Sequence, residues 1–278
     1  MDYKSKIGIG SVQFGVSYGI SNTNGRTSSD EVKRILDTAL NAGINTIDTA
    51  SAYGNAEEVL GNNSLGKFKI ISKFMPPRKG ETIHHQLYKS LEKLQVRTLY
   101  GFLAHRPLDL SKNPEHWEEL KELRNNGVIQ KIGYSLNEPS ELDLLLRMDF
   151  FPDLIQAPFN YFDCRFAERM IELKVQGCEI HSRSSFLQGL FFADTNTLSS
   201  YFNEVKPLIK SLQESIDFLS GSLLKFVIEQ TFIDKVIIGV ENCNQLLTNL
   251  ETIGQSSILP KLVSHIPERI LVPSQWPQ

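Results

Sequence analysis

The chain has 278 residues, of which 41% are hydrophobic and 22% are charged, and its formal net charge at pH 7 is −3. This composition is typical of a globular protein and excludes disordered and collagen-like classes. The balanced charge without basic runs gives no indication of a nucleic-acid or anionic-membrane partner. No stretch approaches the roughly 18 apolar residues of a membrane span, and no long apolar region follows the segment Met1 to Lys6. We therefore expect a cytoplasmic protein without a signal peptide.

The cysteine and histidine patterns argue against a metal site. The chain has three widely spaced cysteines, which form neither a C-x-x-C pair nor a plausible zinc cluster: Cys164, Cys178 and Cys243. We expect them to be buried, reduced thiols. The histidines other than His105 show no mutual spacing typical of metal ligands.

Short apolar runs alternate along the chain with segments of helical period. Three of those segments show helix boundaries: residues 28–43, 117–127 and 167–177 each end in glycine, and the first begins with serines followed by two acidic residues. The apolar runs give eight candidate strands, at residues 7–9, 46–48, 68–72, 100–104, 131–134, 154–156, 179–182 and 236–238.

Eight strands that alternate with helices predict a parallel sheet, and in a chain of this length the sheet closes most naturally into a barrel. The competing doubly wound sheet lacks its G-x-G-x-x-G turn, because Gln13 stands where a third glycine should follow Gly8 and Gly10. We therefore predict an α/β protein that forms one (β/α)₈ TIM-barrel domain over residues 1–278.

Two parts of the chain depart from the regular alternation. Residues 182–236 are long enough for two helices and an excursion, which we place at the C-terminal face of the barrel, where such loops shape the pocket. Residues 254–278 hold four prolines. We expect this tail to wrap over the barrel surface without extending the barrel.

Active-site residues of such barrels project from the C-terminal ends of the strands. The second predicted strand delivers Asp48 and then Tyr53, the third delivers Lys73, and the fourth delivers His105. Taken singly, an aspartate after a strand is usually a helix cap and a lysine is usually solvated. Four such residues at neighbouring strand ends are instead expected to form one cluster.

The residue types in this cluster suit the reduction of a carbonyl group. A phenol has a pKa of about 10 and is a poor acid at neutral pH, but a nearby ammonium stabilises the phenolate, and a carboxylate keeps that ammonium charged. A histidine can donate a hydrogen bond to the substrate oxygen. The hydride must come from a cofactor, because no side chain supplies one. We predict Tyr53 as proton donor, Lys73 and Asp48 as the groups that tune it, and His105 as the residue that orients the oxygen.

Over residues 7–250 the sequence resembles the aldo-keto reductase family. The resemblance lies in GIGSVQFG at residues 8–15, IDTASAYG at 47–54, ISK at 71–73, LAHRP at 103–107 and GVIQKIGYS at 127–135. The family's catalytic tetrad falls on Asp48, Tyr53, Lys73 and His105. The resemblance implies an NAD(P)(H)-dependent oxidoreductase that reduces a small-molecule aldehyde, ketone or keto-sugar to an alcohol.

The resemblance also implies a cofactor site. The nicotinamide carboxamide contacts would fall on Ser135 and Gln156, and residues of the first strand and its loop would add to the wall. The positions implied by the family are Gly10, Ser11, Val12, Ser135, Gln156, Arg183, Ser184, Leu187, Gly239, Val240, Glu241, Gln245 and Asn249.

Three positions depart from the family pattern. Leu136 stands where the family usually has asparagine, and Asn137 follows it. Arg183 stands in the segment where the family stacks an aromatic ring on the nicotinamide, and we expect its planar guanidinium to take that role. Glu241 stands near positions that are basic in NADP-selective members, and a carboxylate is unfavourable beside a 2′-phosphate. The cofactor is therefore NADP or NAD, with the preference open.

Residues 11–15 and 180–190 resemble a bacterial branch of the family associated with surface-polysaccharide and sugar-nucleotide biosynthesis. This likeness makes Arg106, Arg165 and Arg183 candidates for contact with a substrate phosphate or carboxylate, although each is as readily a surface or structural arginine. The sequence is compatible with a monomer or a small homo-oligomer.

Two other functions are compatible with the same residues. Lys73 at a strand end is also the position of a Schiff-base nucleophile in a lyase or aldolase, although Asp48 beside it would keep the lysine charged. A non-catalytic, nicotinamide-binding regulatory subunit would keep the same tetrad.

Overall fold

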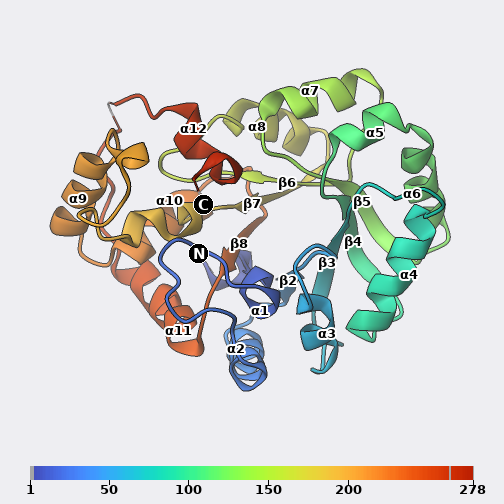
Figure 1. Cartoon of the computed structure of the whole chain (residues 1–278), viewed down its shortest axis with the longest axis horizontal. Helices are drawn as coiled ribbons and strands as arrows, with labels where there is room; N and C mark the ends of the chain where they lie inside the picture. The colour runs from blue at the N-terminus through green and yellow to red at the C-terminus, as the bar shows by residue number, and fades with distance from the viewer. Residues whose placement is uncertain (1–2, 263, 278) are drawn as a thin grey trace.

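The computed structural model describes residues 3–262 and 264–277, which form one domain (Figure 1). Its strands are parallel and close into a barrel in chain order, with β8 pairing back onto β1. The predicted (β/α)₈ barrel is therefore confirmed. The strands are β1 (Ile7–Gly10), β2 (Thr46–Asp48), β3 (Lys69–Phe74), β4 (Leu99–Ala104), β5 (Ile129–Ser135), β6 (Leu154–Pro158), β7 (Glu179–Arg183) and β8 (Lys235–Gly239).

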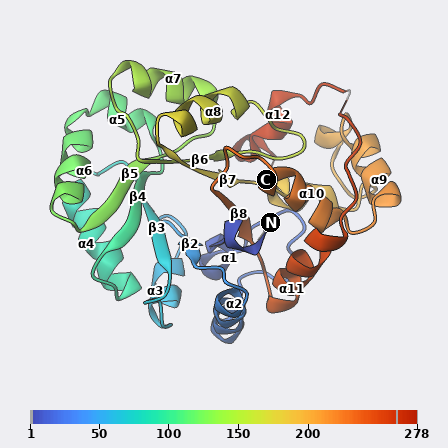
Figure 2. The same ribbon diagram turned by 180° about the vertical axis from the view of Figure 1, so that it is seen from behind.

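Helices surround the barrel, with α4 and α6 on one side and α9 and α11 on the opposite side in both views (Figures 1 and 2). Most strand residues are buried, and many of the buried ones are apolar, as expected for a parallel sheet that is covered by helices. The helices are α1 (Val12–Gly15), α2 (Ser29–Asn41), α3 (Ala56–Gly61), α4 (Ile83–Leu94), α5 (Leu108–Lys112), α6 (Glu115–Asn125), α7 (Pro139–Arg147), α8 (Ala167–Val175), α9 (Lys206–Ser215), α10 (Leu219–Ile228), α11 (Cys243–Thr252) and α12 (Glu268–Leu271).

The predicted helix boundaries have the expected local chemistry. The Ser28 side chain caps α2 by accepting a hydrogen bond from the Glu31 backbone N–H. Gly43, Gly127 and Gly177, which follow α2, α6 and α8, all have positive φ, a conformation that glycine adopts without steric cost. Each helix therefore ends where the chain turns back toward the next strand.

The long unit between β7 and β8 and the C-terminal tail share a second hydrophobic cluster, outside the main core. In it Leu190 and Phe191 pack with Ile209 of α9 and with Ile270 and Trp276 of the tail. The Trp276 ring meets Phe202 edge to face, and its Nε1–H donates to the Ile270 carbonyl at 3.1 Å. The tail is thereby fixed against the insertion that shapes the mouth of the barrel.

The prediction that all three cysteines are buried is wrong for one of them. Cys178 and Cys243 are buried, but Cys164 is exposed, because it lies in the loop between β6 and α8. Within the described residues, no helix is both long and apolar enough to cross a bilayer. The same residues contain no group of three or more His, Cys, Asp or Glu side chains arranged to hold a metal ion.

Candidate active site

The four residues of the predicted tetrad lie at the C-terminal ends of β2, β3 and β4. Asp48 ends β2, Lys73 is the penultimate residue of β3, and His105 follows β4 directly. Tyr53 lies in the loop between β2 and α3 and depends on two glycines. A Cβ on Gly15 would lie 1.7 Å from the Tyr53 carbonyl oxygen, and Gly54 has a φ of +57°. Any side chain at Gly15 would therefore displace Tyr53.

Asp48, Lys73 and Tyr53 form a continuous polar network. Lys73 Nζ donates to both Asp48 carboxylate oxygens at 2.7 Å and to the Thr49 carbonyl at 2.9 Å. The same nitrogen lies 3.5 Å from the Tyr53 hydroxyl. Burial by itself lowers the pKa of the Lys73 ammonium, but Asp48 and Tyr53 outweigh that effect and the pKa is raised. Lys73 is therefore a fixed positive charge next to the phenol oxygen.

His105 faces the other side of Tyr53. The two rings meet edge to face with centroids 5.6 Å apart. Burial, together with the positive charges of Lys73, Arg183 and Arg106, lowers the pKa of His105 to about 3. The imidazole is therefore neutral near pH 7, and its buried Nδ1 has no hydrogen-bond partner among the described residues. A neutral imidazole offers one N–H to an oxygen in the cavity.

The geometry of Lys73 opposes the Schiff-base alternative. The side chain is fully buried and does not belong to the wall of the cavity. Its nitrogen is held by Asp48 and Thr49, and its pKa is raised, whereas an amine nucleophile needs a lowered pKa and access to the substrate.

A cavity of about 980 Å³ opens above the tetrad at the barrel mouth. Asp48, Tyr53 and His105 line it, and most of the cofactor residues implied by the family resemblance line it too. These are Gly10, Ser11, Val12, Ser135, Gln156, Arg183, Ser184, Gly239, Glu241, Gln245 and Asn249. A volume of this order accommodates a cofactor together with a small substrate.

Two of the predicted cofactor residues do not lie in this wall. Leu187 is fully buried in the second hydrophobic cluster, and Val240 is buried in the main core. Both apolar side chains turn inward and anchor their loops, so only the backbone of these two residues could contact a cofactor, and their place in the cofactor site stays a prediction. Leu187 has a φ of +46°, a strained backbone conformation for a leucine.

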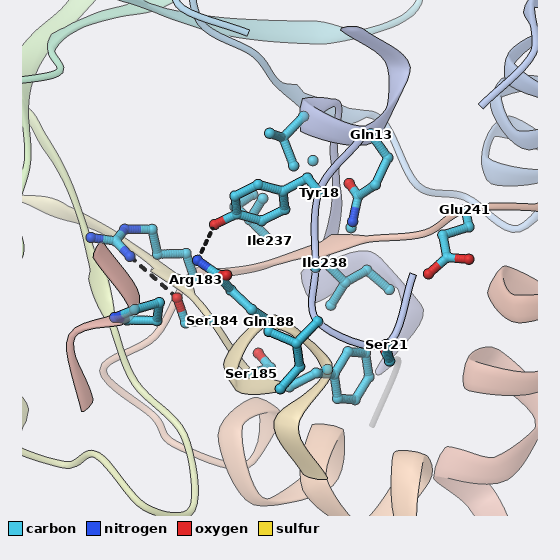
Figure 3. A pocket seen from close by; sticks show the side chains of 18 of the residues that line it. Gln13, Tyr18, Ser21, Arg183, Ser184, Ser185, Gln188, Ile237, Ile238 and Glu241 are labelled. Atoms are coloured by element: carbon cyan, nitrogen blue, oxygen red, sulfur yellow. Dashed lines mark hydrogen bonds between the residues drawn. The ribbon is translucent and has the colours of Figure 1, made fainter. Parts of the chain in front are cut away.

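The cavity wall includes segments that the sequence did not single out. The loop between α1 and α2, residues 16–27, crosses the mouth and is called the crossing loop below. Tyr18 of this loop accepts a hydrogen bond from Gln188 Nε2 at 2.6 Å, and the Ile20 N–H donates to the Gln188 carbonyl at 3.0 Å (Figure 3). Trp276 of the tail also lines the cavity. Because the crossing loop has no regular period, the sequence carried no signal for this contact.

Gln156 connects the tetrad to the cavity. Its Nε2 donates to Asp48 Oδ1 at 2.8 Å. The hydrogen bond to Asp48 uses only the amide nitrogen of Gln156. The amide oxygen plays no part in fixing the tetrad, so Gln156 can hold Asp48 and still accept a hydrogen bond from a ligand. Ser135 lies directly beside it in the β5–β6 register.

Several buried polar atoms of the cavity-lining residues have no hydrogen-bond partner among the described residues. They are the hydroxyl oxygens of Ser11 and Ser185 and the Gln13 amide oxygen. Buried polar groups are normally satisfied, so these atoms indicate a polar ligand. The Gln13 amide lies close to the backbone of Gly239, where a Cβ atom would be only 2.7 Å away from it. The wall formed by β1, β7 and β8 therefore fits a polar cofactor such as a nicotinamide dinucleotide.

The three candidate arginines differ in their surroundings. Arg165 does not line the cavity and is held by Asp163 at 2.9 Å and by Glu138 at 2.7 Å, so it is a structural arginine. Arg183 lines the cavity and donates from Nη2 to the Leu136 carbonyl and to Asn137 Oδ1, each at 2.6 Å. Arg106 also lines the cavity and is exposed.

Two carboxylates lie at the β8–α11 junction, and one of them, Glu241, lines the far end of the cavity. The Glu241 carboxylate accepts from the Asn24 side chain at 3.3 Å. The first backbone N–H of α11, from Cys243, donates to the Glu31 carboxylate at 2.6 Å. A helix N-terminus attracts anions, but here a carboxylate of the protein already occupies part of it.

Comparison with known proteins identifies the family. The Aldo/keto reductase family profile matches residues 6–257. An aldo-keto reductase from Mycolicibacterium smegmatis is 29% identical over 134 residues, 46% of this chain and 47% of that protein. The uncharacterized oxidoreductase YqkF from Bacillus subtilis is 24% identical over 277 residues, with 89% of this chain and 86% of that protein covered. The first alignment thus spans only about half of its relative.

Solved structures show the same fold. An aldo-keto reductase from Klebsiella pneumoniae, crystallised in complex with NADPH, superposes with a TM-score of 0.65 at 20% identity, over 92% of this chain and 87% of that chain. Since the family profile covers nearly the whole chain, this protein belongs to the aldo/keto reductase family.

Proposed function

We propose that the protein is an NAD(P)H-dependent oxidoreductase that reduces an aldehyde, a ketone or a keto-sugar to the alcohol. The observation that supports this most directly is the placement of the Tyr53 hydroxyl between the buried Lys73–Asp48 ion pair and the neutral His105, in the wall of a cavity large enough for a cofactor and a substrate. The Klebsiella relative crystallised with NADPH supports the choice of cofactor.

The proposed proton transfer uses the observed network. A nicotinamide cofactor, when bound beside Ser135 and Gln156, would supply the hydride that the carbonyl carbon needs. His105 donates a hydrogen bond to the carbonyl oxygen and orients it, and Tyr53 gives that oxygen its proton. The Lys73 ammonium, 3.5 Å away, stabilises the phenolate that remains. Asp48 holds Lys73 in place and is itself held by Gln156.

The cofactor is proposed to lie across the mouth with its nicotinamide at Ser135 and Gln156. Phosphate groups in such barrels usually bind at the loops after strands 7 and 8, where Ser184, Ser185 and Gly239 line the cavity. The adenosine would then lie near Glu241 and Gln245, where no lysine or arginine lines the wall among the described residues. A 2′-phosphate there would face the Glu241 carboxylate, and this charge favours NADH over NADPH.

The substrate class rests on the family and on the sequence likeness of residues 180–190 to the surface-polysaccharide branch. This likeness places keto-sugars of carbohydrate metabolism among the compounds to test. We propose that the protein works in the cytoplasm, as a monomer or a small homo-oligomer.

The first experiment is a titration of the protein with NADH and, separately, NADPH, followed by Trp276 fluorescence. Trp276 lines the cavity, whereas Trp117 of α6 is buried in the main hydrophobic core and stacks on Phe150. A Trp276→Phe variant therefore identifies the quenched signal, and calorimetry gives an independent affinity. Micromolar binding together with consumption of NAD(P)H on addition of aldehydes would support the proposal.

Two other outcomes would contradict it. Tight cofactor binding without turnover of any aldehyde, ketone or keto-sugar would indicate the regulatory-subunit alternative. No binding of either cofactor at millimolar concentration would overturn the whole assignment, and borohydride trapping on Lys73 would then test the lyase alternative.

A further inference from the structure

The charges that line the cavity are unevenly distributed. Among the described lining residues, four carry a formal charge: Asp48, Arg106, Arg183 and Glu241. Asp48 is neutralised by Lys73. Glu241 lies in the loop between β8 and α11. In Figure 3, the Tyr18–Gln188 pair lies between Glu241 and Arg183. The end of the cavity near the tetrad therefore carries two guanidinium groups and no carboxylate to balance them.

The partners of Arg183 leave its charge uncompensated. Its guanidinium donates to the Leu136 carbonyl, to Asn137 Oδ1 and to the Ser184 hydroxyl, all of which are neutral acceptors. These three contacts fix the position of the side chain and satisfy some of its five N–H donors without removing its charge. Arg183 is thus a positioned positive charge in the cavity wall.

Arg106 differs from the other candidate arginines because its guanidinium forms neither a hydrogen bond nor an ion pair with another described residue, although its backbone carbonyl accepts from the Asp109 N–H. It follows His105 directly, on the loop after β4, and that loop lies across the barrel mouth from the phosphate-binding position after β7 and β8. Both guanidinium groups lie close enough to His105 to help lower its pKa. Arg106 is therefore beside the position of the reacting carbonyl and away from the expected cofactor phosphates.

We propose that Arg106, assisted by Arg183, binds an anionic group, a carboxylate or a phosphate, carried by the carbonyl substrate. A guanidinium presents paired N–H donors that match either group in a bidentate geometry. This inference rests on the proposed reductase function, because it assigns the substrate that the Tyr53 site reduces. The substrate would then carry an anionic group, which a simple aldehyde, ketone or neutral keto-sugar lacks.

Matched substrate pairs test the proposal. Each pair shares its aldehyde and differs in the anion: succinic semialdehyde against butanal, and glyceraldehyde 3-phosphate against glyceraldehyde. We expect the wild-type kcat/KM to favour the anionic member of at least one pair by tenfold or more. We also expect the preference to weaken as ionic strength rises, because salt screens an exposed charge pair. The pair with the larger preference identifies the anion as carboxylate or phosphate.

Variants of Arg106 assign the preference to this residue. Arg106→Gln should reduce the anion preference by at least tenfold, and Arg106→Lys should restore part of it. The matched control is Arg147→Gln, at the exposed C-terminal end of α7 and outside the cavity wall. Arg183 is left unchanged, because its removal would release the Leu136 carbonyl and Asn137. Equal kcat/KM for both members in the wild-type enzyme, or an equal loss for both in Arg106→Gln, would overturn the proposal.

Two further measurements separate this inference from the proposed function. Calorimetry of the cofactor-loaded protein with succinate and with succinamide detects the anion site without turnover. Succinate binding that depends on Arg106, combined with no reduction of any aldehyde, would retain the anion site and reject the reductase. Loss of cofactor affinity in Arg106→Gln would place the arginine on the cofactor phosphates and contradict the inference.

Discussion

Lys73 donates hydrogen bonds to both carboxylate oxygens of Asp48 at 2.7 Å, and the lysine side chain has no exposed surface. A charge in such a place is stable only while its counter-charge stays beside it. The pair therefore has two roles, because it links the ends of β2 and β3 and presents a positive charge to the Tyr53 oxygen.

The first prediction concerns Asp48→Asn. Removing one partner of a buried ion pair leaves the other charge uncompensated, so the free energy of unfolding should fall by about 3–5 kcal/mol. In the wild type, the raised pKa of Lys73 means that the stability from this pair is present below pH 10.5 and is lost only as pH rises through the folded-state pKa. Urea unfolding at pH 7 measures the effect. The control is Asp30→Asn at the exposed start of α2. A similarly small decrease in the free energy of unfolding of both variants would contradict the stabilising role of the Asp48–Lys73 pair.

The second prediction uses the lowered pKa of His105, about 3 against the ordinary 6.5. Between these values the unfolded chain binds a proton that the folded protein does not, so His105 makes stability fall as pH drops from 6.5 toward 3. His105→Gln removes this contribution. When the pH falls from 7 to 5, the free energy of unfolding of the wild type should decrease by roughly 1–2 kcal/mol more than that of the variant. Urea unfolding at both pH values tests this, and His85→Gln, on the exposed face of α4, should behave as wild type.

The third prediction concerns the crossing loop. Tyr18→Phe removes the hydrogen bond from Gln188 that joins this loop to the segment after β7. A hydrogen bond of this kind contributes about 1 kcal/mol, so the rate of NAD(P)H release should rise roughly fivefold. Stopped-flow displacement of the bound cofactor measures that rate. Tyr88→Phe, on exposed α4, is the control, and an unchanged release rate in Tyr18→Phe would show that the contact does not retain the cofactor.

The fourth prediction concerns cofactor choice. Glu241→Lys replaces a carboxylate in the cavity wall by an ammonium, so the ratio of NADPH affinity to NADH affinity should rise by about tenfold or more. Competitive titration with both cofactors gives the ratio. Glu251→Lys, in the exposed last turn of α11, the helix that follows Glu241, applies the same charge change away from the cavity. Equal shifts in the two variants would show that Glu241 does not face the adenosine.

Local chemistry in the sequence was sufficient to predict the barrel. Most strands contain a short apolar run, although Ile180 is the one apolar residue of β7, and the glycines after α2, α6 and α8 mark the turns. The tetrad could be located for the same reason: Asp48, Lys73 and His105 sit at strand ends, and parallel strands bring their C-terminal ends to one face.

The remainder of the site depends on contacts that no local pattern encodes. Tyr18 meets Gln188 from 170 positions away, and Trp276 reaches the cavity through a tail without regular period. The same limit applies to side-chain direction. Whether Leu187 and Val240 point into the cavity or into the core depends on the loop backbone. Arg165 is a structural arginine because Glu138, a residue of another loop, binds it.

The most direct test of the account is the turnover of Tyr53→Phe with an aldehyde that the wild type reduces, measured together with the affinity for NAD(P)H. The phenylalanine keeps the ring against His105 and removes only the hydroxyl, so cofactor affinity should stay nearly the same. Turnover should fall by about 10²- to 10⁴-fold, the usual contribution of a positioned acid. A variant that keeps more than about a tenth of the wild-type turnover would show that another group donates the proton, and would contradict the central claim.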